Sequence, residues 1–261
     1  MYLGVDIGSS SSKAAILDEK GELKALAIKN LGTGTNAYEE MIAEALKEAG
    51  VSFENIKYTV ATGYGRMGFR YMEKAADKQI TEISCHAKGA SYFVKGARTI
   101  VDIGGQDAKI IRLTEDGRVE NFVMNEKCAA GTGRFIEVMA RVLAVPIGEL
   151  SALADKSRKE IHINNTCTVF AESEVISRLA GGEAIEDVAR GAHVAIAKRV
   201  AGMCQRVGYS PKVVMTGGVA LNPNLVDALS RELKTPVEVV PHCQGAGAVG
   251  AACYALELAN S

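Results

Sequence analysis

The feature that most constrains the fold of this chain is a short segment that occurs twice. Near the N-terminus an apolar strand pattern ends at Asp6, a polar loop with a glycine follows, and the next strand pattern contains Lys13. In the second half Asp102 and Lys109 repeat this arrangement at the same spacing. Two strand, loop and hairpin segments of this kind predict a duplicated α/β chain.

A second pair of matching segments supports the duplication. Residues 60–65 and 214–219 each place Thr-Gly directly after apolar residues. Between the acidic loop and this segment the second half is longer by about 58 residues. We therefore expect an insertion with helical patterns at about residues 125–183, and Cys128 and Cys167 both fall inside it.

Helical spacing is clear in three further places. After the second of these cysteines, Val175, Ile176 and Leu179 fall on one helical face. A longer helix is expected at about residues 183–208. Residues 245–259 predict a closing helix rich in small residues, which lets other groups approach its backbone closely.

The two halves are expected to form two lobes that face each other across a nucleotide cleft. The first lobe is expected to span residues 1–97, and the second is expected to span residues 98–244 with the helical insertion. Residues 245–261 are expected to pack back on the first lobe. Asn36 is expected to cap the first helix of that lobe.

The charge balance and the cysteine content exclude several classes of protein. With 30 basic and 31 acidic side chains, the chain gives no reason to expect binding to nucleic acid or to a membrane surface. No apolar run approaches the roughly 20 residues of a membrane span, and the N-terminus opens on a strand pattern rather than a signal peptide. We therefore expect a cytoplasmic protein with free thiols. Cys85, Cys204 and Cys253 lie in helical patterns and are expected to be buried apolar residues, whereas Cys243 lies in a loop.

The two acidic loops supply the groups that a bound nucleoside triphosphate needs. A carboxylate holds magnesium through water, backbone N–H groups and hydroxyls bind phosphate oxygens, and a lysine adds a cation. A side chain that orients water is also required, and a glycine pair lets adenine and ribose come close. The catalytic candidates are Asp6, Lys13, Asp102 and, for the water, Gln106 or Asp107. The cofactor-binding candidates are Gly8, Ser9, Ser10, Ser11, Ser12, Gly104, Gly105, Gly131, Gly133, Thr216, Gly217, Gly218, Ala220, Asn222 and Gln244.

The paired loops and the later Thr-Gly-Gly turn resemble the superfamily of acetate kinase, hexokinase, Hsp70 and actin. More narrowly, residues 62–66, 125–134 and 165–174 resemble the activators of 2-hydroxyacyl-CoA dehydratases, in the family that includes the ATPase subunits of benzoyl-CoA reductase. The strings KCAAGTGRF and TCTVFAESEVIS are the most specific part of this resemblance, which covers nearly the whole chain. It implies a duplicated actin/Hsp70/hexokinase-like ATPase fold that binds ATP and Mg²⁺.

The resemblance also implies a metal cofactor. In that family a homodimer holds one 4Fe-4S cluster between its subunits, and each subunit gives two cysteines, which correspond to Cys128 and Cys167 here. The residues agree, because two cysteines without a CxxC spacing do not complete a four-thiolate site in one chain, whereas a two-fold dimer supplies four. Each cysteine also precedes a helical pattern, whose N-terminal dipole stabilises a negative cluster. Zinc is an alternative metal, since it also takes four thiolates.

The implied function is ATP-driven electron transfer in anaerobic metabolism. An electron passes from reduced ferredoxin or flavodoxin to a partner iron–sulfur enzyme, such as a 2-hydroxyacyl-CoA dehydratase or a double-cubane cluster protein. ATP binding and hydrolysis move the helices that carry the two cysteines. Two alternatives stay open. One is a small-molecule kinase of the same superfamily, which needs a substrate-binding base rather than paired cysteines, and the other is a nucleotide-gated binding module without a redox step.

Overall fold

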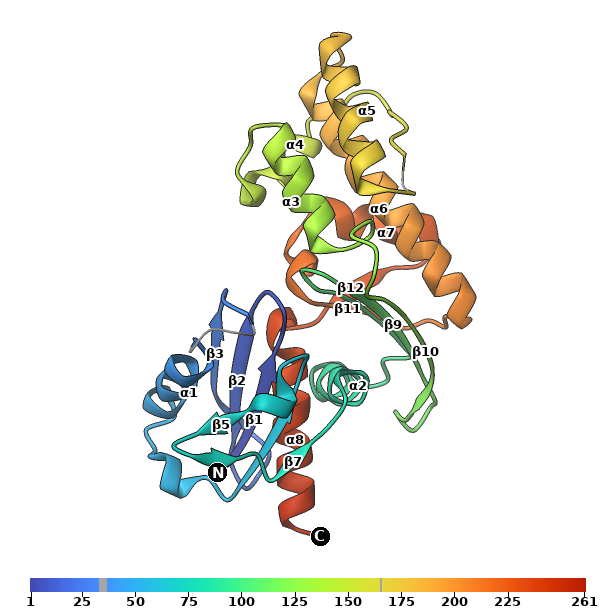
Figure 1. Cartoon of the computed structure of the whole chain (residues 1–261). Coiled ribbons are helices and arrows are strands. Elements are labelled where there is room, and N and C mark those ends of the chain that lie inside the picture. Colours follow the sequence, from blue (N-terminus) through green and yellow to red (C-terminus); the bar gives the residue numbers. More distant parts are fainter. Residues whose placement is uncertain (33–36, 165) are drawn as a thin grey trace. The chain divides into compact units, whose positions relative to one another are not determined.

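The structure is a computed structural model that describes residues 1–32, 37–164 and 166–261 (Figure 1). Asn36, the expected helix cap, and Asn165 lie outside the described residues. The chain divides into two compact units. The first comprises Met1–Ala97, Leu113–Glu120 and Val240–Ser261, and the second comprises Arg98–Arg112 and Asn121–Val239.

The first unit is built on a five-stranded sheet with the strand order β3-β2-β1-β4-β7. β1 pairs with β2 in antiparallel fashion and with β4 in parallel fashion. A separate two-stranded sheet is formed by β5 and β6. The elements are β1 (Tyr2–Ile7), β2 (Ser12–Leu17), β3 (Leu23–Lys29), α1 (Ala37–Glu48), β4 (Tyr58–Thr62), β5 (Arg70–Tyr71), β6 (Lys74–Ala75), β7 (Lys78–Gln79), α2 (Glu82–Phe93) and α8 (Ala246–Ala259).

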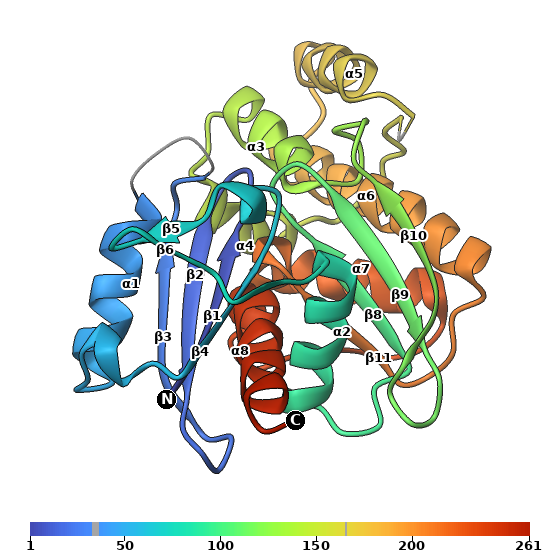
Figure 2. The ribbon, with the colours of Figure 1, turned by 60° about the horizontal axis from the view of Figure 1, so that its bottom comes forward.

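Both faces of this sheet are covered, which explains why β1 is buried along its whole length. Because side chains alternate along a strand, β1 sends Leu3, Val5 and Ile7 into a cluster with Ile42 and other apolar residues of α1. The opposite face packs against α2 and α8, as Figure 2 shows. Burial of a side chain such as Ile42 stabilises the unit by about 1.5–3 kcal/mol.

Small residues bring α2 and α8 into backbone contact. A Cβ atom at Gly89 would lie 1.8 Å from the Ala246 carbonyl oxygen, and one at Gly250 would lie 1.8 Å from the Cys85 carbonyl oxygen. No side chain fits at either glycine without moving the helices apart. Glycine at both positions is therefore required for the backbone contact between α2 and α8. The expectation of a closing helix that permits close approach is confirmed.

The second unit repeats the sheet with the strand order β10-β9-β8-β11-β12. β8 pairs with β9 in antiparallel fashion and with β11 in parallel fashion, as β1 does with β2 and β4. The elements are β8 (Thr99–Ile103), β9 (Ala108–Leu113), β10 (Val119–Asn125), α3 (Gly133–Val142), α4 (Leu150–Ala154), α5 (Thr168–Ala180), α6 (Ile185–Val207), β11 (Val213–Thr216), α7 (Pro223–Leu233) and β12 (Val237–Val239).

The long helix α6 is the centre of the second unit, where it contacts α3, α4, α5 and α7. It ends at Gly208, whose φ of 72° is a conformation that glycine adopts without strain. α5 differs from expectation, because Ile176 is 52% exposed while Val175 is buried. No helix in the described ranges is long and apolar enough to span a membrane.

Candidate functional site

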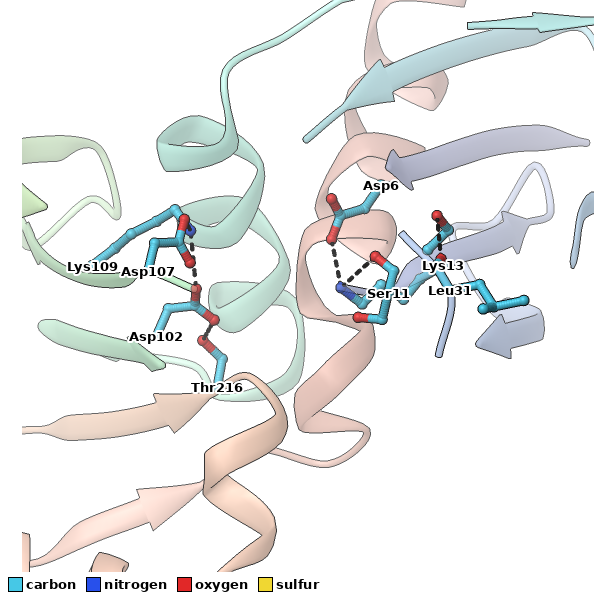
Figure 3. Close-up of polar contacts among 9 residues, drawn as sticks. Asp6, Ser11, Lys13, Leu31, Asp102, Asp107, Lys109 and Thr216 are labelled. Atoms are coloured by element: carbon cyan, nitrogen blue, oxygen red, sulfur yellow. Dashed lines mark hydrogen bonds and ion pairs between the residues drawn. The ribbon is translucent and has the colours of Figure 1, made fainter. Parts of the chain in front are cut away.

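The first acidic loop lies between β1 and β2. Asp6 is buried, and the Lys13 Nζ atom lies 3.3 Å from its Oδ2 atom (Figure 3). Lys13 also donates to the Ser11 carbonyl oxygen at 3.4 Å, and the Gly8 N–H donates to the same oxygen at 3.1 Å. These contacts close a tight turn that holds the carboxylate and the ammonium group together at the end of the sheet.

The second acidic loop has the same construction between β8 and β9. Lys109 Nζ lies 3.4 Å from Asp102 Oδ2 and 2.6 Å from Asp107 Oδ2 (Figure 3). The Gly104 N–H donates to the Asp107 carbonyl oxygen at 2.9 Å. Thr216, at the end of β11, donates from its hydroxyl to Asp102 Oδ1 at 2.8 Å. Both oxygens of the buried Asp102 carboxylate therefore have protein partners.

The equal spacing in the sequence reflects equal strand register. Asp6 lies directly opposite Lys13 in the β1–β2 ladder, and Asp102 lies opposite Lys109 in the β8–β9 ladder. Each unit thus presents an aspartate and lysine pair at the corresponding point of its own sheet. Lys109, which was not among the predicted site residues, is the second-half counterpart of Lys13.

The Thr-Gly segments also match between the two units. Gly63 and Gly217 both have positive φ, 88° and 87°. A Cβ atom would lie 2.5 Å from the Ile7 carbonyl oxygen at Gly63 and 2.3 Å from the Ile103 carbonyl oxygen at Gly217. Each glycine is therefore required by the backbone of the neighbouring strand. Nucleotide contact at Thr216, Gly217, Gly218 and Ala220 stays a prediction.

Asn222 ends this segment and begins α7. Its Oδ1 accepts the Leu225 N–H at 3.0 Å, and proline follows at the first helical position. Its Nδ2 atom lies 3.0 Å from His193 Nε2, and His193 Nδ1 lies 2.8 Å from Asn224 Oδ1. His193 is fully buried, and desolvation lowers its pKa to about 4. A neutral imidazole therefore holds the start of α7 in place.

The remaining nucleotide candidates differ in exposure. Ser9 and Ser10 are exposed, whereas Ser12 is buried in β2 and donates its hydroxyl to the Leu31 carbonyl oxygen at 3.2 Å. Gln106 is exposed, while Asp107 is held by the Lys109 ion pair. Gln106 therefore has the more exposed side chain of the two candidates, and a role of either in orienting water stays a prediction. The other candidates are Gly105 in the second loop and Gln244 in a short turn of the first unit.

Cys128 lies in a turn between β10 and α3. The Asn125 side chain holds this turn from inside, because its Oδ1 accepts the Cys128 N–H at 3.2 Å and its Nδ2 donates to the Cys128 and Ala130 carbonyl oxygens at 2.8 and 3.0 Å. Gly131 has a φ of 88°, which closes the turn. The helix dipole acts mainly within the first turn of a helix. α3 begins only at Gly133, so Cys128 lies outside that turn.

Cys167 occupies a different position at a helix end. It is the N-terminal cap residue of α5, and its carbonyl oxygen accepts the Ala171 N–H at 3.0 Å. The helix-dipole argument therefore applies to Cys167 and not to Cys128. Downstream of Cys167, Val169 and Phe170 are 64% and 66% exposed, which is high for apolar side chains.

The six cysteines fall into two groups. Cys85, Cys204, Cys243 and Cys253 are buried, and burial raises the pKa of Cys85 and Cys204 to about 12 and that of Cys253 to about 11. These three thiols stay protonated and are inert, as expected. Cys128 and Cys167 are half-buried and so differ from the other four cysteines in exposure. Within the described part of the chain, no three Cys, His, Asp or Glu side chains form a group that holds a metal ion.

Comparisons with known proteins cover the whole chain. The model of the BadF/BadG/BcrA/BcrD ATPase family matches residues 3–255. The activator of lactoyl-CoA dehydratase from Anaerotignum propionicum is 50% identical over 261 residues, 100% of this chain and 99% of that protein. The structure of the activator of the 2-hydroxyisocaproyl-CoA dehydratase from Clostridium difficile with bound ADPNP is 46% identical, with a TM-score of 0.94 over 100% of this chain and 96% of that chain.

More distant structures share the fold alone. A ROK family glucokinase from Streptomyces griseus is 15% identical, with a TM-score of 0.59 over 98% of this chain and 99% of that chain. The expected actin/Hsp70/hexokinase-like ATPase fold is confirmed.

Proposed function

The chain belongs to the BadF/BadG/BcrA/BcrD ATPase family, and we propose that it is an ATP-dependent activator that delivers low-potential electrons to a partner iron–sulfur enzyme. The observation that carries this proposal is the identity of 46–50% over the full chain to proteins named as dehydratase activators. The partner is a 2-hydroxyacyl-CoA dehydratase or a related double-cubane cluster protein, and the electron donor is a ferredoxin or flavodoxin.

The matched loops support the ATPase half of the proposal. Asp6 and Asp102 are buried carboxylates at strand ends, where each is paired with a lysine. We propose that each carboxylate is able to hold magnesium through water ligands, and we assign Lys13 to the phosphates. Gln106, exposed beside Asp107, orients the attacking water. We also propose that the two compact units are the two ATPase lobes expected at residues 1–97 and 98–244, although residues 113–120 and 240–244 belong to the first unit, as the closing helix does.

The two half-buried cysteines support the electron-transfer half of the proposal. Cys128 and Cys167 fit a 4Fe-4S cluster, because they are free, half-buried and unlike the four buried cysteines. Two thiolates per chain require a homodimer to complete a four-thiolate site. The exposed Val169, Phe170 and Ile176 on α5 provide apolar surface next to Cys167 for that second copy. When bound, the cluster supplies one-electron redox chemistry.

Metal content tests this proposal directly. Anaerobically purified protein is expected to contain about two irons and two acid-labile sulfides per chain, which is one four-iron cluster per dimer. Cys128→Ala should lose the iron and retain ATP binding. Cys204→Ala, which removes a buried thiol of the same unit, should retain both. Zinc in place of iron, or full iron content in Cys128→Ala, would exclude this assignment.

Electron paramagnetic resonance separates the activator from a small-molecule kinase. An activator should give a reduced-cluster signal with dithionite that changes when ATP is added. A kinase should instead release ADP only with an acceptor substrate and should contain no iron.

A further inference from the structure

The start of α3 rests on the second acidic loop. The Gly133 N–H donates to the Gly104 carbonyl oxygen at 2.8 Å, and the Arg134 N–H donates to the Gly105 carbonyl oxygen at 2.8 Å. The first N–H groups of a helix have no partner within the helix and are usually capped by a side chain. Thr132, at the cap position, makes no such bond from its side chain. The loop carbonyls therefore cap α3.

Gly133 packs so closely against the loop that an added Cβ atom would force its neighbours to shift. A Cβ atom at Gly133 would lie 3.0 Å from the Gly104 oxygen, 3.2 Å from the Gly105 Cα atom and 3.5 Å from a methyl group of Val219. Val219 belongs to the Thr-Gly-Gly segment. Because close-packed protein transmits small displacements, we expect the first turn of α3 to move together with the loop.

Thr132 connects this helix start to the cysteine turn. It is fully buried, and both its hydroxyl and its N–H donate to the Ala129 carbonyl oxygen, at 2.8 and 3.1 Å. Ala129 follows Cys128 directly, and the Asn125 amide holds Cys128 from the other side. Gly133, which is bonded to the loop, is covalently joined to Thr132, and Ala129, which accepts both bonds from Thr132, is covalently joined to Cys128. Hydrogen bonds and peptide bonds together thus connect the loop carbonyls to the backbone of Cys128.

We propose that Thr132 is a positioning residue that couples the loop at residues 102–107 to the Cys128 turn. The inference rests on the proposed ATP site and names the contact through which that site regulates the cysteine. Nucleotide at the loop moves the Gly104 and Gly105 carbonyls, and α3 and Thr132 pass this displacement to the turn. A ligand shifts such an equilibrium only through contacts that differ between the two states.

Two substitutions at Thr132 separate its hydroxyl from its shape. Thr132→Val keeps the branched side chain and removes the donor to the Ala129 oxygen. Thr132→Ser keeps the donor and removes only a methyl group. Hydrogen exchange measured by mass spectrometry on the anaerobically purified full chain, with and without the β,γ-imido analogue of ATP and Mg²⁺, reports residues 102–107 and 125–134 separately.

In the native protein we expect the nucleotide analogue to slow exchange in both segments. In Thr132→Val the slowing at 102–107 should persist, while the nucleotide effect at 125–134 should shrink by about fivefold, as for loss of one hydrogen bond. Thr132→Ser should restore it.

The outcomes distinguish this inference from the proposed function. No slowing at 102–107 in the native protein would refute the ATP site itself. Slowing at 102–107 without any at 125–134, or an unchanged response in Thr132→Val, would overturn the coupling while leaving the ATP site intact.

Discussion

The buried ion pair of the second loop gives the most direct quantitative prediction. In Lys109→Met, a side chain of similar length replaces the ammonium group and leaves the Asp102 carboxylate without it. The side chains of Asp102 and Lys109 are both 3% exposed, so water does not replace the lost partner. Removal of one member of a buried pair costs about 3–5 kcal/mol. The hydroxyl of Thr216 remains on the other carboxylate oxygen, so we expect the lower end, about 3 kcal/mol.

Urea denaturation followed by circular dichroism measures this free energy of unfolding. The control is Lys24→Met, which breaks ion pairs to Asp18 and Glu22 at the surface and should change stability little. The double variant Asp102→Asn, Lys109→Met removes both charges and should be more stable than Lys109→Met alone. A loss below about 1 kcal/mol in Lys109→Met, in the range of surface pairs, would refute the reasoning.

Three other residues allow separate tests. Burial lowers the pKa of His193 to about 4 from 6.5, so between these values the unfolded chain takes up a proton that the folded chain does not. Stability in urea titrations should therefore fall by about 2 kcal/mol from pH 7 to pH 5, and His193→Gln should lack this loss. Gly217→Ala, with its Cβ atom 2.3 Å from a carbonyl oxygen of β8, should lower the melting temperature, whereas Gly202→Ala, in open space, should not. Asn125→Asp removes the amide donor to the Cys128 carbonyl oxygen, and metal analysis should show less iron than in the native protein.

Much of the fold could be predicted because its strands and long helices carry strong local patterns. The helices expected at about residues 183–208 and at residues 245–259 agree with α6 (Ile185–Val207) and α8 (Ala246–Ala259) within a few residues. The short strands β5, β6 and β7 were not predicted, since two residues such as Lys78–Gln79 are too few to show an alternating pattern. Ile176 is exposed although the sequence pattern places it on one helical face with Val175, because helical spacing identifies a face without showing how much of it a neighbour covers.

The candidate site was predictable where its residues repeat. The equal spacing of Asp6 to Lys13 and of Asp102 to Lys109 indicated matched pairs, and strand register confirms that each pair lies face to face. The contact of Gly133 and Arg134 with Gly104 and Gly105 could not be predicted, because this loop lies well before α3 in the sequence. No local pattern reports a bond of that kind.

The first unit is assembled from segments that leave the ribosome at different times. β1, β2 and α2 are made before the second unit, whereas α8 is made after it. At roughly 5–20 residues per second, the interval is on the order of ten to thirty seconds. Throughout it, Ala15 and Leu17 lack the helix that covers them, and this apolar face stays uncovered until the second unit, which ends at Val239, has been made. The unit that begins first is thus completed last.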